Sequence, residues 1–402
     1  MKNRQRALLS VLIALVVACA LAGSGAPWAG DLAEVSGKVL DSQTHAIAGA
    51  QVTLSGVGWA PVTLETSAHG DFRFWGVRTN KGYRIGAKKD GFREIEYDGL
   101  YIGPGEKRLV QFRLKKVGER EAVALVTRDP IPEAGLVRSF LEGLGVETRT
   151  IDLDAERDPA ETVRRVAAEK PDLILATGLR AAQLVRSEVR DVPSIVTLIG
   201  DPRTYDLRAP NICFLENNPA PSAVIERVVT LLPKVHRLGL VFSADSSGLL
   251  ARDLREEAGR RGLEVELFGW FEARHAIRNL DLAPEPFDAL LVLFDPLSTA
   301  PGALETLTSW SLRHKVPLVA PQADWMRRGA LFSFGASLDQ MGAQARSMGR
   351  QILFEGRQPE DFGVRYAAEP ILSINRGTAT ALGIALPDSA DLAPSEPPSH
   401  AR

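Results

Sequence analysis

The fold of this protein is decided by the stretch KPDLILATG, residues 170–178. Residues 173–176 form a short, uninterrupted apolar run, which is typical of a strand buried on both faces of a sheet. Thr177 and Gly178 follow the run, and helical periodicity extends over residues 179–189. A buried strand, a tight turn and a helix in this order indicate a parallel sheet covered by helices.

The same alternation continues on both sides of this stretch. Further strand-like runs lie at residues 122–127, 146–153, 194–199, 238–242, 264–268, 289–294, 317–320 and 331–334. Helical runs lie between them at residues 136–144, 160–169, 248–261, 273–280, 303–313 and 339–354. We therefore predict an α/β fold of two consecutive lobes with parallel sheets, residues 121–218 and 219–386. A helical segment at 219–232 should carry the chain into the second lobe, and a strand-like stretch at 368–374 is a candidate for the return.

A different pattern precedes the lobes. Residues 31–116 alternate apolar and polar side chains in short runs that are separated by Gly- and Asp-containing turns. Short alternating strands at this spacing predict a small all-β sandwich.

The first thirty residues have the order of a signal peptide. A cationic start is followed by an apolar run at residues 7–18, which is shorter than the roughly 20 residues that a membrane span needs. Two processing routes fit: cleavage after the ALA motif at 20–22, or a lipobox in which Cys19 becomes a lipidated N-terminus. Residues 387–402 are rich in Pro, Ser, Asp and Ala, and we expect disorder there.

The composition limits the classes of function. The 402 residues are 45% hydrophobic, enough to bury large cores, and the net charge of −2 gives no electrostatic reason to expect nucleic acid or an anionic membrane surface as a partner. The only cysteines are Cys19 and Cys213, so no intramolecular disulfide is expected. The six histidines are scattered, and no nucleophile elbow or phosphate-binding loop is present. We expect no metal, no cofactor and no enzymatic activity.

The order of short motifs in the lobes resembles the ABC-transporter substrate-binding family of the tryptophan/tyrosine type, which has a type I periplasmic-binding fold. The motifs are KPDLILATG (170–178), VPSIV (192–196), GDP (200–202), LPKVHRLG (232–239), GALFSFG (329–335) and MGRQIL (348–353). The module at 31–116 is similar to the carboxypeptidase regulatory-like domain, a transthyretin-like sandwich, through SGKV (36–39), IAGAQVTL (47–54), GDFRF (70–74) and GYRI (82–85). The resemblance implies a two-lobed periplasmic-binding-protein-like fold behind an accessory module.

Ligands of open α/β sheets bind beyond the carboxyl ends of the strands, and this rule selects the candidate site residues. The candidates are Thr177, Gly178, Asp201, Ser243, Asp245, Ser246, Asp295, Gln322, Trp325, Phe334 and Gly335. Backbone N–H groups at Thr177 and Gly178 could hold a carboxylate, or could form an ordinary helix cap. Asp201 and Asp295 could bind an ammonium group or fix their Asp-Pro turns. Ser243, Asp245 and Ser246 are also good helix caps, and Trp325 could stack on a ligand or pack in the core.

These features together predict an exported solute-binding protein, periplasmic or anchored as a lipoprotein, and monomeric. Its lobes would close over a small zwitterionic solute and present it to the permease subunits of an ABC transporter in the membrane. The alternative is an envelope-anchored scaffold or sensor that keeps the fold without transport. A hydrolase with an unrecognised active site is a third and weaker hypothesis.

Overall fold

The computed structural model describes residues 32–56, 59–79, 81–127, 134–270, 280–283, 286–300, 302–333, 335, 337–367 and 372–386. The predicted signal peptide with Cys19, residues 273–279 of the helix predicted at 273–280, and the tail at 387–402 lie outside the described residues. The chain forms two compact units, one up to residue 119 with residues 168–170, and one from residue 120 onward.

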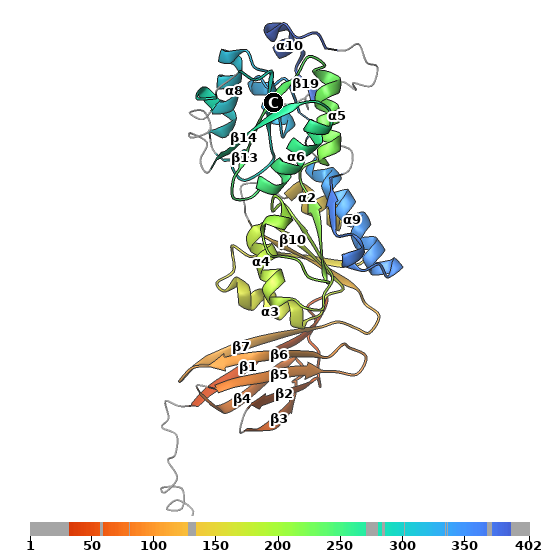
Figure 1. The fold of residues 1–402 in the computed structure, drawn as a ribbon. Coiled ribbons are helices and arrows are strands. Elements are labelled where there is room, and N and C mark those ends of the chain that lie inside the picture. Colours follow the sequence, from red (N-terminus) through yellow and green to blue (C-terminus); the bar gives the residue numbers. More distant parts are fainter. Residues whose placement is uncertain are drawn as a thin grey trace, which may run out of the picture. The chain divides into compact units, whose positions relative to one another are not determined.

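The first unit is a β-sandwich, drawn in red to orange in Figure 1. Its three-stranded sheet contains β4 (Asp71–Arg78), β1 (Leu32–Asp41) and β7 (Lys107–Leu114), in that order. Its four-stranded sheet contains β3 (Trp59–Glu65), β2 (Gln51–Gly56), β5 (Lys81–Lys88) and β6 (Ile95–Ile102). Alternate residues of these strands face a core in which Phe72, Phe74 and Phe112 are in ring contact.

The first lobe of the second unit contains a six-stranded parallel sheet. The strand order is β18 (Val364–Tyr366), β12 (Ile212–Glu216), β11 (Ser194–Thr197), β10 (Leu173–Thr177), β8 (Glu121–Val126) and β9 (Glu147–Asp152). Every residue of β10 is buried, because separate apolar clusters cover the two faces of the sheet. The covering helices are α2 (Ala134–Leu141), α3 (Pro159–Ala168), α4 (Leu179–Glu188) and α9 (Leu338–Glu355).

The second lobe repeats this plan. Its sheet has the order β14 (Glu264–Trp270), β13 (Arg237–Ser243), β15 (Ala289–Val292), β16 (Leu318–Ala320), β17 (Phe332–Ser333) and β19 (Ser373–Ile374). Only β19 runs antiparallel to its neighbour. The helices are α5 (Pro221–Leu231), α6 (Gly248–Arg260), α8 (Ala303–His314) and α10 (Arg376–Leu382). Figure 1 shows α5 and α6 side by side on one face of this sheet.

Helix α9 belongs to the first lobe, which corrects the division of the chain at residue 219. The helix itself was predicted at 339–354, but it packs against α2, and its side chains Met341, Ala345 and Met348 join the apolar cluster under that helix. Close approach is possible because Gly342 lies against the backbone of Leu136, where an added Cβ would come within 2.3 Å of the carbonyl oxygen. The strand β18, which was not predicted, then pairs with β12, so the chain crosses between the lobes three times.

The fold class is otherwise as predicted from the sequence: two α/β lobes with parallel sheets, and a preceding β-sandwich. Strand β12 was also missed, and β11 is shorter than the predicted run. Within the described part of the chain, no helix combines the length and the apolar character that crossing a membrane requires.

Candidate ligand-binding site

The carboxyl end of β10 carries the most directly predicted site residues. Thr177 is paired in register with Thr197 of β11, which is paired in turn with Leu215 of β12. Thr197 Oγ1 donates a hydrogen bond of 2.8 Å to the Leu215 carbonyl. Thr177 Oγ1 is equally buried, yet it has no hydrogen-bond partner among the described residues. Gly178 follows in the left-handed half of φ space (φ 89°), and α4 begins directly after it.

The carboxyl end of β12 forms a buried polar turn of three residues. Glu216 Oε1 accepts hydrogen bonds from the backbone N–H groups of the next two residues, Asn217 (3.1 Å) and Asn218 (3.2 Å). Asn218 Nδ2 donates to the same oxygen at 3.2 Å. The Asn217 amide is buried, and neither its oxygen nor its nitrogen has a partner among the described residues.

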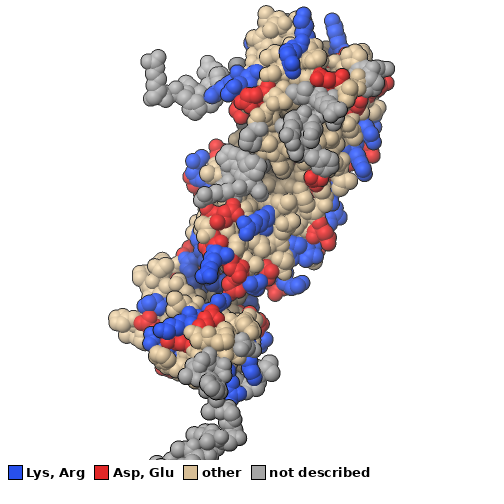
Figure 2. Space-filling model, turned by 90° about the vertical axis from the view of Figure 1, so that its left-hand side faces the viewer, with Lys and Arg blue, Asp and Glu red and all other residues tan. Residues whose placement is uncertain are grey.

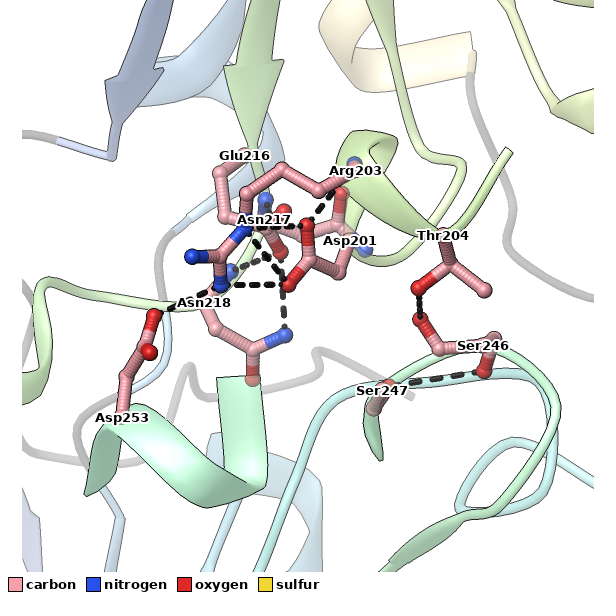
Figure 3. Close-up of polar contacts among 9 residues, drawn as sticks. All are labelled: Asp201, Arg203, Thr204, Glu216, Asn217, Asn218, Ser246, Ser247 and Asp253. Atoms are coloured by element: carbon pink, nitrogen blue, oxygen red, sulfur yellow. Dashed lines mark hydrogen bonds and ion pairs between the residues drawn. The ribbon is translucent and has the colours of Figure 1, made fainter. Parts of the chain in front are cut away.

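The loop after β11 contacts the second lobe. Asp201 N donates to the Ser246 carbonyl across the lobes at 3.1 Å, and Thr204 Oγ1 donates to the same oxygen at 3.3 Å. Arg203 binds both carboxylate oxygens of Asp201 and also reaches Asp253 of α6, each at 2.6 Å at the closest. Figure 3 shows the Arg203 guanidinium between the two carboxylates. The hydrogen bond that Arg203 donates to Asp201 is the largest of the influences that raise the pKa of Arg203.

In the second lobe, Asp295 lies in the loop after β15. One of its oxygens accepts the N–H of Ser243 at 2.6 Å, and the other accepts those of Leu297 (3.1 Å) and Ser298 (3.0 Å). Burial raises the pKa of this carboxyl to about 6, although the hydrogen bonds act in the opposite direction. Asp295 therefore ties together the ends of β13 and β15.

The other predicted site residues differ in how exposed they are and in what they contact. Asp245 is exposed, and Gln322 is half-buried at the start of the 3-10 helix η3 (Ala323–Arg328). Trp325 lies in an apolar cluster of the second lobe and packs as a core residue. Gly335 approaches the Pro321 carbonyl so closely that an added Cβ would overlap it at 1.7 Å. Phe334 lies outside the described residues.

Two residues of this edge were not selected from the sequence. Asn217 follows the missed strand β12, and Ser333 ends β17 with a buried Oγ that has no partner among the described residues. The signal for the first was present, because ICFL at 212–215 is a short apolar run between polar turns. Ser333 lay inside a predicted strand, and nothing in the sequence marks its hydroxyl as unpaired.

The two sets of strand ends face each other. Asn218, after β12 of the first lobe, is hydrogen-bonded to the backbone of Phe294, after β15 of the second lobe, in both directions (2.8 and 2.9 Å). A small cavity of about 20 Å³ lies where Asn217, Asn218, Phe294, Pro321 and Gly335 meet. This volume suits a water molecule and no larger guest.

A second, larger hollow lies at the other edge of the second lobe. It has a volume of about 490 Å³ and is lined by residues such as Phe287, Trp310 and Val316, which stand near the amino ends of β15 and β16. Asp281 Oδ1 accepts the indole N–H of Trp310 at 2.7 Å on its wall. Because ligands of such sheets bind at the carboxyl ends of the strands, we do not assign the solute site to this hollow.

The charges of the described surface are mixed in sign. Figure 2 shows Lys and Arg side chains interspersed with Asp and Glu over the face that is drawn. In the described ranges, no group of three or more His, Cys, Asp or Glu side chains could hold a metal ion. Cys213 is buried in β12, and burial raises the pKa of its thiol to about 12.

Comparisons with known proteins agree with this architecture. Residues 141–396 match the family model described as ABC transporter substrate binding protein, and residues 34–115 match the carboxypeptidase regulatory-like domain. Because the first match spans more than half of the chain, the protein belongs to the family of ABC transporter substrate-binding proteins. Within that family it carries an N-terminal carboxypeptidase regulatory-like domain.

Individual relatives are distant. The tyrosine-binding protein of Clostridioides difficile (strain R20291) is 23% identical over 244 residues, which are 58% of this chain and 70% of that protein. The L-Trp complex of an ABC domain from Streptococcus pneumonia is 21% identical with a TM-score of 0.52, covering 67% of this chain and 97% of the other. A ligand-free, open substrate-binding protein with adhesive properties from Clostridium difficile is 19% identical with a TM-score of 0.53, covering 68% and 98%.

Proposed function

We propose that this protein is an exported solute-binding protein that holds a small, amino-acid-like solute between its two lobes. The observation that carries the proposal is a set of buried polar groups at facing strand ends that have no hydrogen-bond partner in the described ranges: the Thr177 hydroxyl, the Asn217 amide and the Ser333 hydroxyl. A buried polar group without a partner costs about 1–3 kcal/mol. A solute that supplied the missing hydrogen bonds would recover this free energy, and binding would therefore be favoured at this edge.

The proposed roles follow from the chemistry of each group. The N-terminus of α4, beside Thr177 and Gly178, is suited to a solute carboxylate, because helix N-termini present N–H groups and a positive dipole end. The Asn217 amide has no partner for its oxygen or its nitrogen among the residues that the structure describes, and its oxygen suits an ammonium group. Asp201 and Asp295 are already engaged with Arg203 and with backbone N–H groups, so we assign them to ordering the loops.

The chemistry of the solute is suggested by the relatives. One is a tyrosine-binding protein, and another was crystallised with L-Trp. Both ligands are zwitterions, which need one site for an anion and one for a cation. We therefore propose an amino acid or a similar zwitterion, with aromatic amino acids as the first candidates to test.

The cellular setting of the proposal depends on the N-terminal region. We propose export through the signal-peptide-like residues 1–30, with lipidation at Cys19 as one route, and delivery of the solute to an ABC permease. The mass of the mature N-terminus distinguishes a diacylated Cys19 from cleavage after residue 22.

Thermal or urea unfolding of the mature protein against a panel of amino acids, purines, sugars and organic acids tests the function. A solute present at about 100 times its dissociation constant should add about 2.7 kcal/mol to the free energy of unfolding. We expect such a gain from at least one amino acid. No gain across the panel would contradict solute binding and favour the scaffold or sensor reading.

Two threonine variants make the test specific. Thr177→Val should abolish most of the solute-dependent gain in stability. It should leave the solute-free protein as stable as the original or more stable, because the Thr177 hydroxyl has no partner in the part of the chain that the structure describes. Thr197→Val is the matched control on the neighbouring strand. It should lower the solute-free stability by about 1 kcal/mol, because it removes the bond to Leu215, and should keep the gain. If Thr177→Val keeps the solute-dependent gain and Thr197→Val loses it, Thr177 does not contact the solute.

A further inference from the structure

We propose that Glu216 and Asn218 form a proton-sensitive clasp between the two lobes, and that uptake of a proton by Glu216 tightens it. The clasp lies at the first crossing of the chain, between β12 and α5. The inference rests on the proposed function only in its consequence for solute affinity. The clasp itself is defined by contacts of the protein with itself.

The Asn218 amide is the bridge between the lobes. Its Nδ2 donates to the Phe294 carbonyl at 2.9 Å, and its Oδ1 accepts the Phe294 N–H at 2.8 Å. The Phe294 side chain is buried in the apolar cluster of the first lobe, although its backbone continues from β15 of the second lobe. The first lobe therefore holds this residue of the second lobe by both its backbone and its ring.

Glu216 holds the bridge in place. Three hydrogen bonds, two from the Asn218 residue and one from Asn217 N, end on its Oε1. Figure 3 shows Glu216, Asn217 and Asn218 gathered beside Asp201 and Arg203. If the clasp loosened, the Asn218 amide and the Glu216 carboxyl would both become accessible to water.

No ion pair compensates Glu216 among the described residues, although the side chain is only 2% exposed. The charged and titratable groups around it come from several elements: Asp201 and Arg203 from the loop after β11, Asp253 from α6 and Tyr366 from β18. Asp295 follows Phe294, the residue to which Asn218 is hydrogen-bonded. The Arg203 guanidinium is engaged by Asp201 and Asp253. Burial is the main cause that raises the pKa of Glu216 from 4.5 to about 7, and the Asp201 charge acts in the same direction.

The sign of the effect follows from proton linkage. The intact clasp holds the Glu216 proton with a pKa of about 7, whereas a hydrated Glu216 would lose it near 4.5. The intact form therefore binds the proton more tightly and is favoured as the pH falls, and loosening is favoured as the pH rises through 7. Between pH 6 and pH 8 the ratio of loosened to intact clasp should rise roughly tenfold.

Hydrogen exchange of the solute-free protein measures this ratio. The amide N–H groups of Asn217, Asn218 and Phe294 are followed at pH 6, 7 and 8, and each rate is corrected for intrinsic exchange. We expect the opening constant to rise roughly tenfold over this range. A pH-independent opening constant at these three amides would overturn the proposal.

Two variants assign the effect to Glu216. Glu216→Gln keeps an acceptor oxygen and cannot ionise, so the opening constant should stay constant from pH 6 to pH 8. Glu226→Gln, on the exposed side of α5, is the matched control and should behave like the original protein. A pH dependence that survives in Glu216→Gln would assign the titration to another group and overturn the proposal. Asn218→Ala should remove protection of the Phe294 N–H at every pH.

The solute gives a separate readout. If the bound state requires the intact clasp, the dissociation constant of an identified amino acid should be higher at pH 8 than at pH 6, and Glu216→Gln should remove the difference. A solute panel without a hit would contradict the proposed function and leave the exchange result unaffected. A clear solute effect with pH-independent exchange would support the function and contradict the clasp.

Discussion

Arg203 shows how one side chain can join two elements of different lobes. Its guanidinium binds Asp201, which is 2% exposed, and reaches Asp253 on α6. A buried carboxylate that loses its cation costs about 3–5 kcal/mol, whereas a half-exposed ion pair contributes about 0.2–1 kcal/mol. The contact of Arg203 with Asp201 should therefore contribute more to the free energy of unfolding than its contact with Asp253.

We expect Arg203→Ala to lower the free energy of unfolding by about 3 kcal/mol, because it leaves Asp201 buried without a cation. Asp253→Ala should cost about 1 kcal/mol or less. Urea unfolding measures both values. Adding Asp201→Asn to Arg203→Ala should restore part of the loss, since it removes the uncompensated charge. Equal losses in the two single variants would show that Asp201 does not depend on Arg203.

At the scale of elements, the placement of α9 depends on glycine. Gly342 lies against the Leu136 carbonyl of α2, and Arg346 Nη1 donates to two carbonyls at the end of that helix, those of Ser139 (2.7 Å) and Glu142 (2.6 Å). The helical period of residues 339–354 was evident from the sequence. The partner of the helix was not, because both lobes offer an apolar face and periodicity does not distinguish them.

Gly342→Ala should therefore destabilise the second unit by about 1–3 kcal/mol, because the new methyl group would force α9 away from α2. The matched control is Gly259→Ala in α6, where an added Cβ meets nothing within 4 Å. That variant should be neutral or stabilise by up to about 1 kcal/mol through helix propensity. Urea unfolding of both variants checks the pair, and a neutral Gly342→Ala would mean that the two helices are not in close contact.

At the scale of the whole molecule, two buried carboxyl groups set an unusual dependence of stability on pH. Burial raises the pKa of Glu216 to about 7 and that of Asp295 to about 6, above the ordinary values of 4.5 and 3.8. A raised pKa means that the folded protein binds the proton more tightly than the unfolded chain. The stability contributed by these groups is therefore present at low pH and is lost as the pH rises through 6 to 7.

We expect the contribution of these groups to the free energy of unfolding to be larger at pH 5.5 than at pH 8. Urea unfolding of the original protein and of Glu216→Gln at both pH values measures the contribution of Glu216 alone. The variant should lose less stability between the two pH values than the original protein does. If both proteins lost the same free energy of unfolding between pH 5.5 and pH 8, Glu216 would not be a cause of the pH dependence.

The sequence by itself determined the fold class, because the period of apolar residues reports which faces of each segment are buried. The run at 173–176, with the turn at Thr177 and Gly178, was sufficient to predict a parallel sheet and the edge at which a solute should bind. The repeated alternation predicted two lobes, and the turn-rich region before them predicted a sandwich. These features are local: each depends only on residues that are close together in the sequence, so the sequence alone reveals them.

Only the tertiary structure decided which buried polar side chains of the described residues have hydrogen-bond partners. Thr177 and Thr197 look alike in the sequence, yet within the described part of the chain the Thr197 hydroxyl has a partner and the Thr177 hydroxyl has none. Asp295, a predicted ligand contact, is held by three backbone N–H groups. The buried Glu216 and Asn218 lie at the end of β12, a strand that was not predicted although its apolar run is present in the sequence. The physical reason is that hydrogen bonding and burial depend on residues distant in the chain, which come together only when the chain crosses between the lobes.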